Sequence, residues 1–235
     1  MTMASFTLAR KVDPRYKTNL TILIMTITLL IARGLFTGEM GGSLVFAGGF
    51  FLTWALAREI DPLHDQSAFV AAAVYLAMTM WIVELNLGLV FWTILLLRSI
   101  TKIAGRKPTV IDLLGLIGLG IYVIINMSIR LPGEPLAGDG FRILLLILGS
   151  GAGIFYGRML KGDRGIRDDL GNPVESQTIV LSYTVFLGMY VVLFIATDLG
   201  EGTLSLFFAV IMGTALHRGW MMISGSITNR RSSGR

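Results

Sequence analysis

The sequence predicts an all-α integral membrane protein, a single polytopic bundle of eight transmembrane helices over residues 1–235. Hydrophobic residues make up 54% of the chain and charged residues only 15%, whereas soluble domains carry roughly a quarter charged residues. Apolar runs near the ~17–25 residues that cross a bilayer core recur along the chain. A third observation, the distribution of the basic residues, predicts how these helices are oriented.

The first two predicted helices lie on either side of a short glycine-containing connection. A basic segment, residues 1–17, precedes the first helix, residues 19–36. A signal peptide has a similar layout, but Arg33 interrupts the small residues where cleavage would occur, so we expect an uncleaved helix. The second helix covers residues 42–57 and ends in a polar turn, residues 58–67.

The apolar run from residue 68 to residue 97 contains Glu84 as its only charge. A single helix of this length would be ~45 Å long at 1.5 Å per residue, which exceeds the thickness of the hydrocarbon layer. We therefore divide the run near residues 84–88 into two helices that form a tight hairpin. A basic loop closed by Pro108 follows it.

Four further helices are predicted in the second half of the chain, separated by loops rich in glycine, proline or charged residues. They cover residues 110–129, 143–159, 178–197 and 204–223, and a basic tail, residues 224–235, follows them. No loop approaches the ~50 residues that a soluble domain needs. The whole chain is therefore expected to form one transmembrane domain.

The basic residues predict the orientation of the bundle. If the N-terminus is cytoplasmic, all of the 20 Lys and Arg residues fall on the inner side except Arg33, Arg130 and Arg142. Such asymmetry is typical of positive-inside sorting. It predicts cytoplasmic termini in a multi-pass protein of the cell membrane (the prokaryotic inner membrane or its equivalent). It also accounts for the net charge of +5 without a nucleic-acid partner.

The two halves of the bundle share a weak pattern. The second and the sixth predicted helix both carry glycines and end in an arginine, Arg58 and Arg158, followed by an acidic loop. Halves of four helices each have the same orientation, so this would be a parallel 4+4 repeat. Any eight-helix protein with basic inner loops would share some of these features, and both interpretations stay open.

The polar turn, residues 58–67, is the first candidate for chemistry. Asp61 and Asp65 have a D-x-x-x-D spacing, and His64 is one of only two histidines. Carboxylates hold Mg²⁺ well, and a histidine can pass protons. The alternative is structural: Asp61-Pro62 stops a helix, and Asp65 or Ser67 caps the next one.

The loop of residues 161–173 is a second acidic cluster, at the end of the sixth predicted helix. If the second and sixth helices are neighbours, the two clusters could face each other and hold a magnesium-bound phosphate. The metal ligands would be Asp61, Asp65, Asp163, Asp168 and Asp169, and the phosphate-binding residues would be Arg58, Arg164 and Arg167. The alternative is a solvated turn with mixed charges.

This placement of two acidic clusters resembles the intramembrane prenyltransferases of the UbiA type. The resemblance implies two aspartate-rich motifs that hold Mg²⁺-diphosphate at the cytoplasmic face. The first motif of that family has Asn-Asp ahead of further aspartates, whereas this chain reads Arg58-Glu59-Ile60-Asp61. The resemblance therefore concerns placement only, and membership of that family is not predicted.

Two further groups of residues stand out inside the predicted helices. Gly149, Gly153 and Gly157 recur every four residues, which makes a flat face for close helix packing. Glu84 and Arg33 are possible intramembrane charges, which are often found along transport pathways. Glu84 could pair with Arg33 or with Arg142 if the hairpin lies deep in the membrane.

The chain has no cysteine and no zinc-protease, nucleophile-elbow or P-loop motif. We therefore expect a protein without catalytic activity: a helical subunit of a membrane complex or a small transporter. Its partners would be the bilayer and other membrane subunits or further copies of itself. The alternative is a magnesium-dependent membrane enzyme that acts on a lipid-linked phosphate or diphosphate, and only this alternative implies a cofactor.

Overall fold

We describe a computed structural model of the chain over residues 13–62, 64–79, 85–101, 109–125, 148–152, 176–196 and 201–232. These residues form helices and short connections, without any strand. The helices are α1 (Lys17–Thr37), α2 (Met40–Ile60), α3 (Asp65–Thr79), α4 (Leu87–Thr101), α5 (Val110–Ile125), α7 (Ser176–Ala196) and α8 (Glu201–Ser232). Residues 148–152 are also helical.

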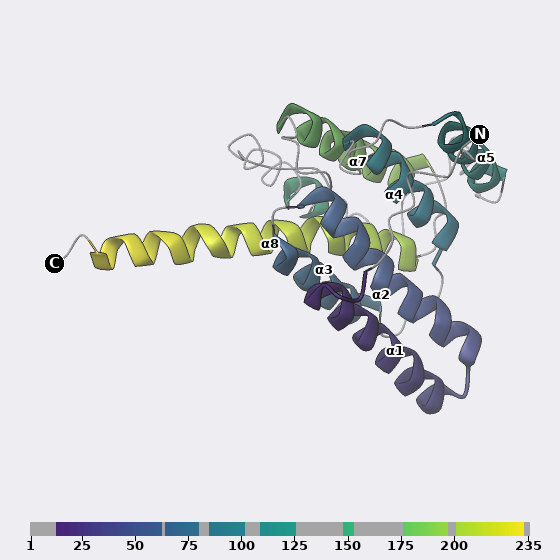
Figure 1. Cartoon of the computed structure of the whole chain (residues 1–235), viewed down its shortest axis with the longest axis horizontal. Coiled ribbons are helices and arrows are strands. Elements are labelled where there is room, and N and C mark those ends of the chain that lie inside the picture. Colours follow the sequence, from purple (N-terminus) through teal and green to yellow (C-terminus); the bar gives the residue numbers. More distant parts are fainter. Residues whose placement is uncertain are drawn as a thin grey trace.

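Helix α2 lies at the centre of the described part and packs against α1, α3, α4 and α8 (Figure 1). The most extensive helix pair is α3 with α8, while α4 also contacts α5 and α7. Helix α8 begins inside the bundle and extends far beyond it (Figure 1). Its 32 residues correspond to ~48 Å at 1.5 Å per residue.

The antiparallel arrangement of α1 and α2 depends on Gly38. This residue follows α1 with a φ of 71°, a left-handed conformation that glycine adopts without steric strain. Its N–H donates to the Gly34 carbonyl oxygen at 3.0 Å, which closes the last turn of α1. The chain can therefore reverse within a few residues and begin α2 at Met40.

The core is apolar and lies mainly between α2, α3 and α8. Phe50 of α2, Ala71 of α3 and Phe207 of α8 are almost fully buried. The rings of Phe186 and Phe207 pack edge to face at 5.6 Å between their centroids, a favourable geometry for aromatic pairs. The Tyr75 hydroxyl, which is also buried, donates to the Phe46 carbonyl oxygen at 3.3 Å. Burial of these side chains holds the central helices together.

Two glycines allow close approach between helices. A Cβ atom on Gly213 of α8 would collide with the backbone of Ala71 in α3, so this position has no room for a side chain. A Cβ on Gly149 would lie 2.7 Å from the hydroxyl oxygen of Tyr190 in α7. Gly149 therefore lies in a contact, whereas Gly153 and Gly157 lie outside the described residues, and their shared packing face stays a prediction.

The structure divides the long apolar run as expected, because α3 ends at Thr79 and α4 begins at Leu87. The tight hairpin was wrong, however. The described parts of α3 and α4 pack against α2 rather than closely against each other. Helix α8 also differs from its expected end at residue 223, since it continues to Ser232. No proline lies between residues 223 and 232 to stop it.

Three of the described helical segments are long and apolar enough to cross a membrane: Lys17–Thr37, Met40–Ile60 and Gly202–Ser224. Shorter apolar helices cover Leu87–Thr101, Val110–Val123 and Ile179–Val192. Large hydrophobic side chains such as Ile27, Leu35 and Phe36 are exposed on α1. These features are consistent with a membrane protein. Eight crossings, cytoplasmic termini and the 4+4 repeat stay predictions.

Candidate functional site

Charged side chains from several helices gather where α2 ends. They form three arginine–carboxylate pairs, which we call the polar layer. The pairs are Arg58 with Asp65, Glu59 with Arg98, and Asp61 with Arg218. At ~100° per residue along a helix, neighbouring positions of α2 face different directions. The end of α2 is therefore paired with three different helices, α3, α4 and α8.

Arg58 joins α2 to both α1 and α3. Its Nη1 donates to the Asn19 side-chain oxygen at 2.9 Å, and its Nη2 lies 3.0 Å from Asp65 Oδ1. The guanidinium also lies over the Trp54 ring, 5.0 Å from the ring centroid, which is within the range of a cation–π contact. Asp65 is 42% exposed, so its pair with Arg58 is partly solvated.

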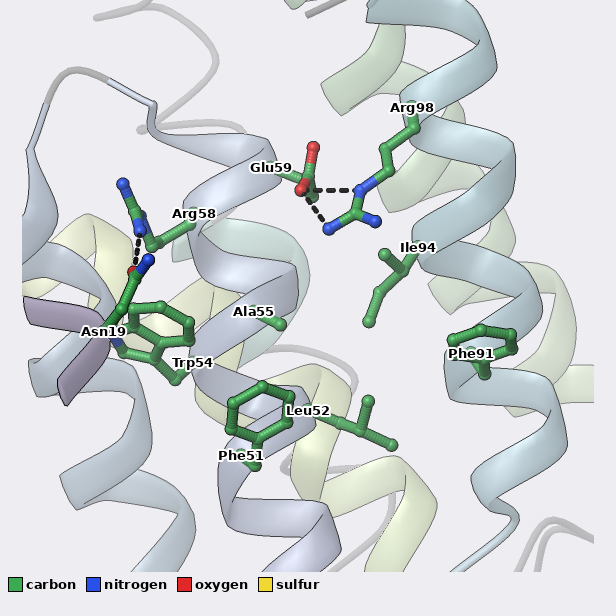
Figure 2. A pocket seen from close by; sticks show the side chains of 10 residues that line it. All are labelled: Asn19, Phe51, Leu52, Trp54, Ala55, Arg58, Glu59, Phe91, Ile94 and Arg98. Carbon is green, nitrogen blue, oxygen red and sulfur yellow. Dashed lines mark hydrogen bonds and ion pairs between the residues drawn. The ribbon is translucent and has the colours of Figure 1, made fainter. Parts of the chain in front are cut away.

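Glu59 joins α2 to α4 through Arg98 (Figure 2). The Arg98 Nε and Nη2 both lie 2.8 Å from Glu59 Oε1. The Glu59 side chain is only 3% exposed and that of Arg98 14%. Charge-assisted hydrogen bonds of this length, shielded from solvent, are stronger than bonds between neutral groups.

Asp61 joins the polar turn to α8. Its side chain is fully buried, and its Oδ1 accepts a hydrogen bond from Arg218 Nη2 at 3.1 Å. The same oxygen lies 3.0 Å from His64 Nδ1. Asp61 Oδ2 is buried and has no hydrogen-bond partner in the described part of the chain. The His217 ring lies 5.9 Å from the His64 ring, so two histidines adjoin one buried carboxylate.

The polar turn stops α2 as predicted, because α2 ends at Ile60, just before Asp61-Pro62. The predicted caps of α3 are wrong, however. Helix α3 already begins at Asp65, whose carboxylate pairs with Arg58. Ser67 lies inside the helix, and its hydroxyl donates to the His64 carbonyl oxygen at 2.7 Å.

The magnesium site was predicted from Asp61 and Asp65 together with the second acidic loop. These two carboxylates contact different arginines. No group of three or more His, Asp or Glu residues among the described positions could hold a metal ion. The remaining predicted ligands and phosphate-binding residues, Asp163, Asp168, Asp169, Arg164 and Arg167, lie outside the described residues. The complete five-carboxylate site therefore stays untested.

The two possible intramembrane charges have different outcomes. The Arg33 guanidinium lies over the Phe46 ring, 4.3 Å from its centroid, so it packs between α1 and α2. Glu84 lies outside the described residues. Their predicted pairing is therefore untested.

A pocket lies beside the polar layer, between α2 and α4 (Figure 2). Its volume of about 130 Å³ is well above the ~10–15 Å³ that one water molecule needs. Polar and apolar side chains line it together: Asn19, Phe51, Leu52, Trp54, Ala55, Arg58, Glu59, Phe91, Ile94 and Arg98. We call it the α2–α4 pocket.

Sequence reasoning missed two members of this site, Asn19 and Glu59. Asn19 lies 39 residues from its partner Arg58, and Glu59 lies 39 residues from Arg98. One signal was present, because Arg58 and Glu59 lie in the last turn of α2 and face different directions, while Asp61 follows directly after the helix. No family model matches the chain, and no curated protein and no solved structure matches it either.

Proposed function

We propose that this chain is a small membrane transporter without catalytic activity, in which the polar layer is the gate that closes one end of the bundle. The main support for this proposal is that three arginine–carboxylate pairs join the end of α2 to α3, α4 and α8. Ionisable residues within membrane-spanning segments are rare and are generally functional. Here they connect the very helices that would separate if this end opened.

Ion pairs suit a gate because each charged group can replace its partner by water when the gate opens. A buried ion pair adds little net stability, since the desolvation of both charges offsets their attraction. When the helices separate, water replaces the lost partner of each charge. Transport by alternating access requires that each end of the bundle can open and close around a fixed binding site.

The basic residues support a cytoplasmic position for this gate in a multi-pass cell-membrane protein. Lys17 begins α1, and Arg58, Arg98 and Arg218 belong to one polar layer. Positive-inside sorting assigns residues of this kind to the cytoplasmic side. The sequence left the complex subunit and the transporter open, and we now prefer the transporter because a subunit requires no ionisable layer. The alternative hypothesis, a magnesium-dependent enzyme, needs metal ligands from the acidic loop of residues 161–173, which lies outside the described residues.

Cysteine labelling tests the gate directly, because the chain has no cysteine of its own. Thr214 is fully buried on α8, one turn before Arg218. A cysteine at this position can react with a water-soluble reagent only when the polar layer opens. Asp61→Asn preserves the shape of the side chain but removes its charge. Weakening this charge-assisted hydrogen bond, worth ~1.5–3 kcal/mol when intact, should raise the labelling rate by as much as roughly a hundredfold. The rate is measured by labelling the purified protein in detergent with a water-soluble maleimide.

Tyr16→Cys, at an exposed position just before α1, is the matched control for reagent access. It should react at the same rate with and without Asp61→Asn. Melting curves ensure that labelling is measured well below unfolding. An unchanged rate at Thr214→Cys in the folded Asp61→Asn protein would argue against a gate at this layer and hence against the transporter.

A further inference from the structure

The two histidines of the chain meet at the polar layer. His64 belongs to the polar turn and His217 to α8, and their ring centroids lie 5.9 Å apart beside Asp61. Histidine is the side chain that ordinarily gains or loses a proton between about pH 5 and about pH 8. The fold therefore brings both such groups, far apart in the sequence, to the end of the bundle that we propose as the gate.

His64 connects water to the buried Asp61 carboxylate. Its side chain is 22% exposed, whereas that of Asp61 is fully buried. The His64 Nδ1 atom lies 3.0 Å from Asp61 Oδ1, a distance at which a proton can pass between the two groups. A proton from the surrounding water can thus reach Asp61 through the His64 ring, although the carboxylate itself has no contact with solvent.

The hold of Asp61 on α8 depends on one oxygen atom. Oδ1 interacts with both Arg218 Nη2 and His64 Nδ1, while Oδ2 is buried and accepts no hydrogen bond from the described residues. A proton that passes from His64 arrives at the oxygen to which Arg218 also donates. The carboxyl group is then neutral, and a hydrogen bond from a guanidinium to a neutral acid is weaker than one to a carboxylate.

The other charged side chains of the polar layer have partners of their own, so a proton at Asp61 acts on the pair with Arg218. The described residues also form no metal-holding group around Asp61, which leaves Arg218 and the two histidines as the groups that face it. The other pairs are Arg58 with Asp65 of α3 and Glu59 with Arg98 of α4.

We infer that Asp61 is a proton-binding site that opens the gate, with His64 as the residue that delivers the proton. This inference rests on the proposed function and names the ion that would drive it. A hydronium ion in the adjoining water gives a proton to His64, which passes it to Asp61 and returns to its neutral form. Asp61 becomes a neutral acid, Arg218 keeps its charge and gains water, and α8 separates from the polar turn. Asp and His residues form such proton relays in membrane transporters.

The Thr214→Cys labelling assay tests this inference when it is run at about pH 7 and at about pH 5, on either side of the ordinary titration of histidine. Tyr16→Cys corrects for the slower reaction of a thiol at low pH, so the ratio of the two rates reports the gate alone. This ratio should rise at least about tenfold on acidification and approach the ratio of Asp61→Asn at about pH 7. In Asp61→Asn, whose side chain takes up no proton, the ratio should be the same at both pH values.

Each part of the argument can fail separately. If Asp61→Asn speeds labelling but acid does not, the gate stands and the proton-binding site is wrong. If acid raises the ratio equally in Asp61→Asn, other groups respond to the pH, and the site at Asp61 is wrong as well. If Asp61→Asn has no effect on labelling, the gate itself is wrong, and this inference falls with it.

Infrared spectra after a rapid drop from about pH 7 to about pH 5 show the proton on the carboxyl group directly. A C=O stretching band of a carboxylic acid should appear in the unmodified chain and be missing from Asp61→Asn. His64→Gln can still hydrogen-bond to Asp61 but cannot carry a proton, so the same band should appear at least about tenfold more slowly. An equally fast band in His64→Gln would overturn its role in delivery, and an unchanged spectrum in Asp61→Asn would overturn the site.

Discussion

Gly213→Val should destabilise the protein more than any other glycine substitution among the described helices. A Cβ at this position would lie closer to the Ala71 backbone than atoms can approach. Backbone atoms cannot rotate away as a side chain can, so α3 and α8 would have to separate. Overpacking of this kind costs ~1–3 kcal/mol and occasionally more, and here it affects the most extensive helix pair among the described helices. Thermal unfolding in detergent measures the loss.

Gly188→Val in α7 is the matched control, since a Cβ there meets nothing within 4 Å. Its effect should stay within ~0.5 kcal/mol, as for most exposed substitutions. A second comparison separates backbone from side-chain collision. Ala71→Gly should not rescue Gly213→Ala, because the nearest atoms are the Ala71 Cα and N. A rescue, or equal losses at Gly213 and Gly188, would contradict the close contact.

The length and hydropathy of the apolar runs were sufficient to predict the helices of the first half. The division of residues 68–97 followed from helix length alone, and the structure has it between Thr79 and Leu87. The end of α2 followed from Asp61-Pro62. Each of these predictions depends on residues that are close in the sequence, where chain geometry limits the possibilities.

Contacts between helices could not be predicted in the same way. Asp61 and Arg218 are separated by 157 residues, and nothing in the local sequence indicates that α8 lies beside the polar turn. The tight hairpin failed for this reason, since α3 and α4 both pack on α2. Gly213 was overlooked because a single glycine has no spacing pattern, whereas Gly149, Gly153 and Gly157 have one. A close approach depends on the partner, here Ala71.

Asp61→Ala should destabilise the protein by ~3–5 kcal/mol, the usual effect of removing one partner of a buried ion pair. The Asp61 side chain is fully buried and that of Arg218 is 11% exposed, so the arginine would lose this carboxylate without gaining much water. Asp65→Ala is the control, because Asp65 is 42% exposed and partly solvated pairs contribute only ~0–1 kcal/mol. Chemical unfolding of the purified variants gives both values. Equal effects would mean that burial does not distinguish the two pairs.

The double variant Asp61→Leu/Arg218→Met separates stability from gating. Replacing a buried ion pair by apolar side chains of similar size is often neutral or stabilising, so this variant should unfold close to the unmodified protein. An apolar contact cannot exchange its partner for water, and a gate built from it should therefore stay closed. In the Thr214→Cys protein, the double variant should be labelled no faster than the protein with the native Asp61 and Arg218. Asp61→Asn, in contrast, should be labelled faster. If the double variant instead opens like Asp61→Asn, the layer closes this end through its charges and not through packing.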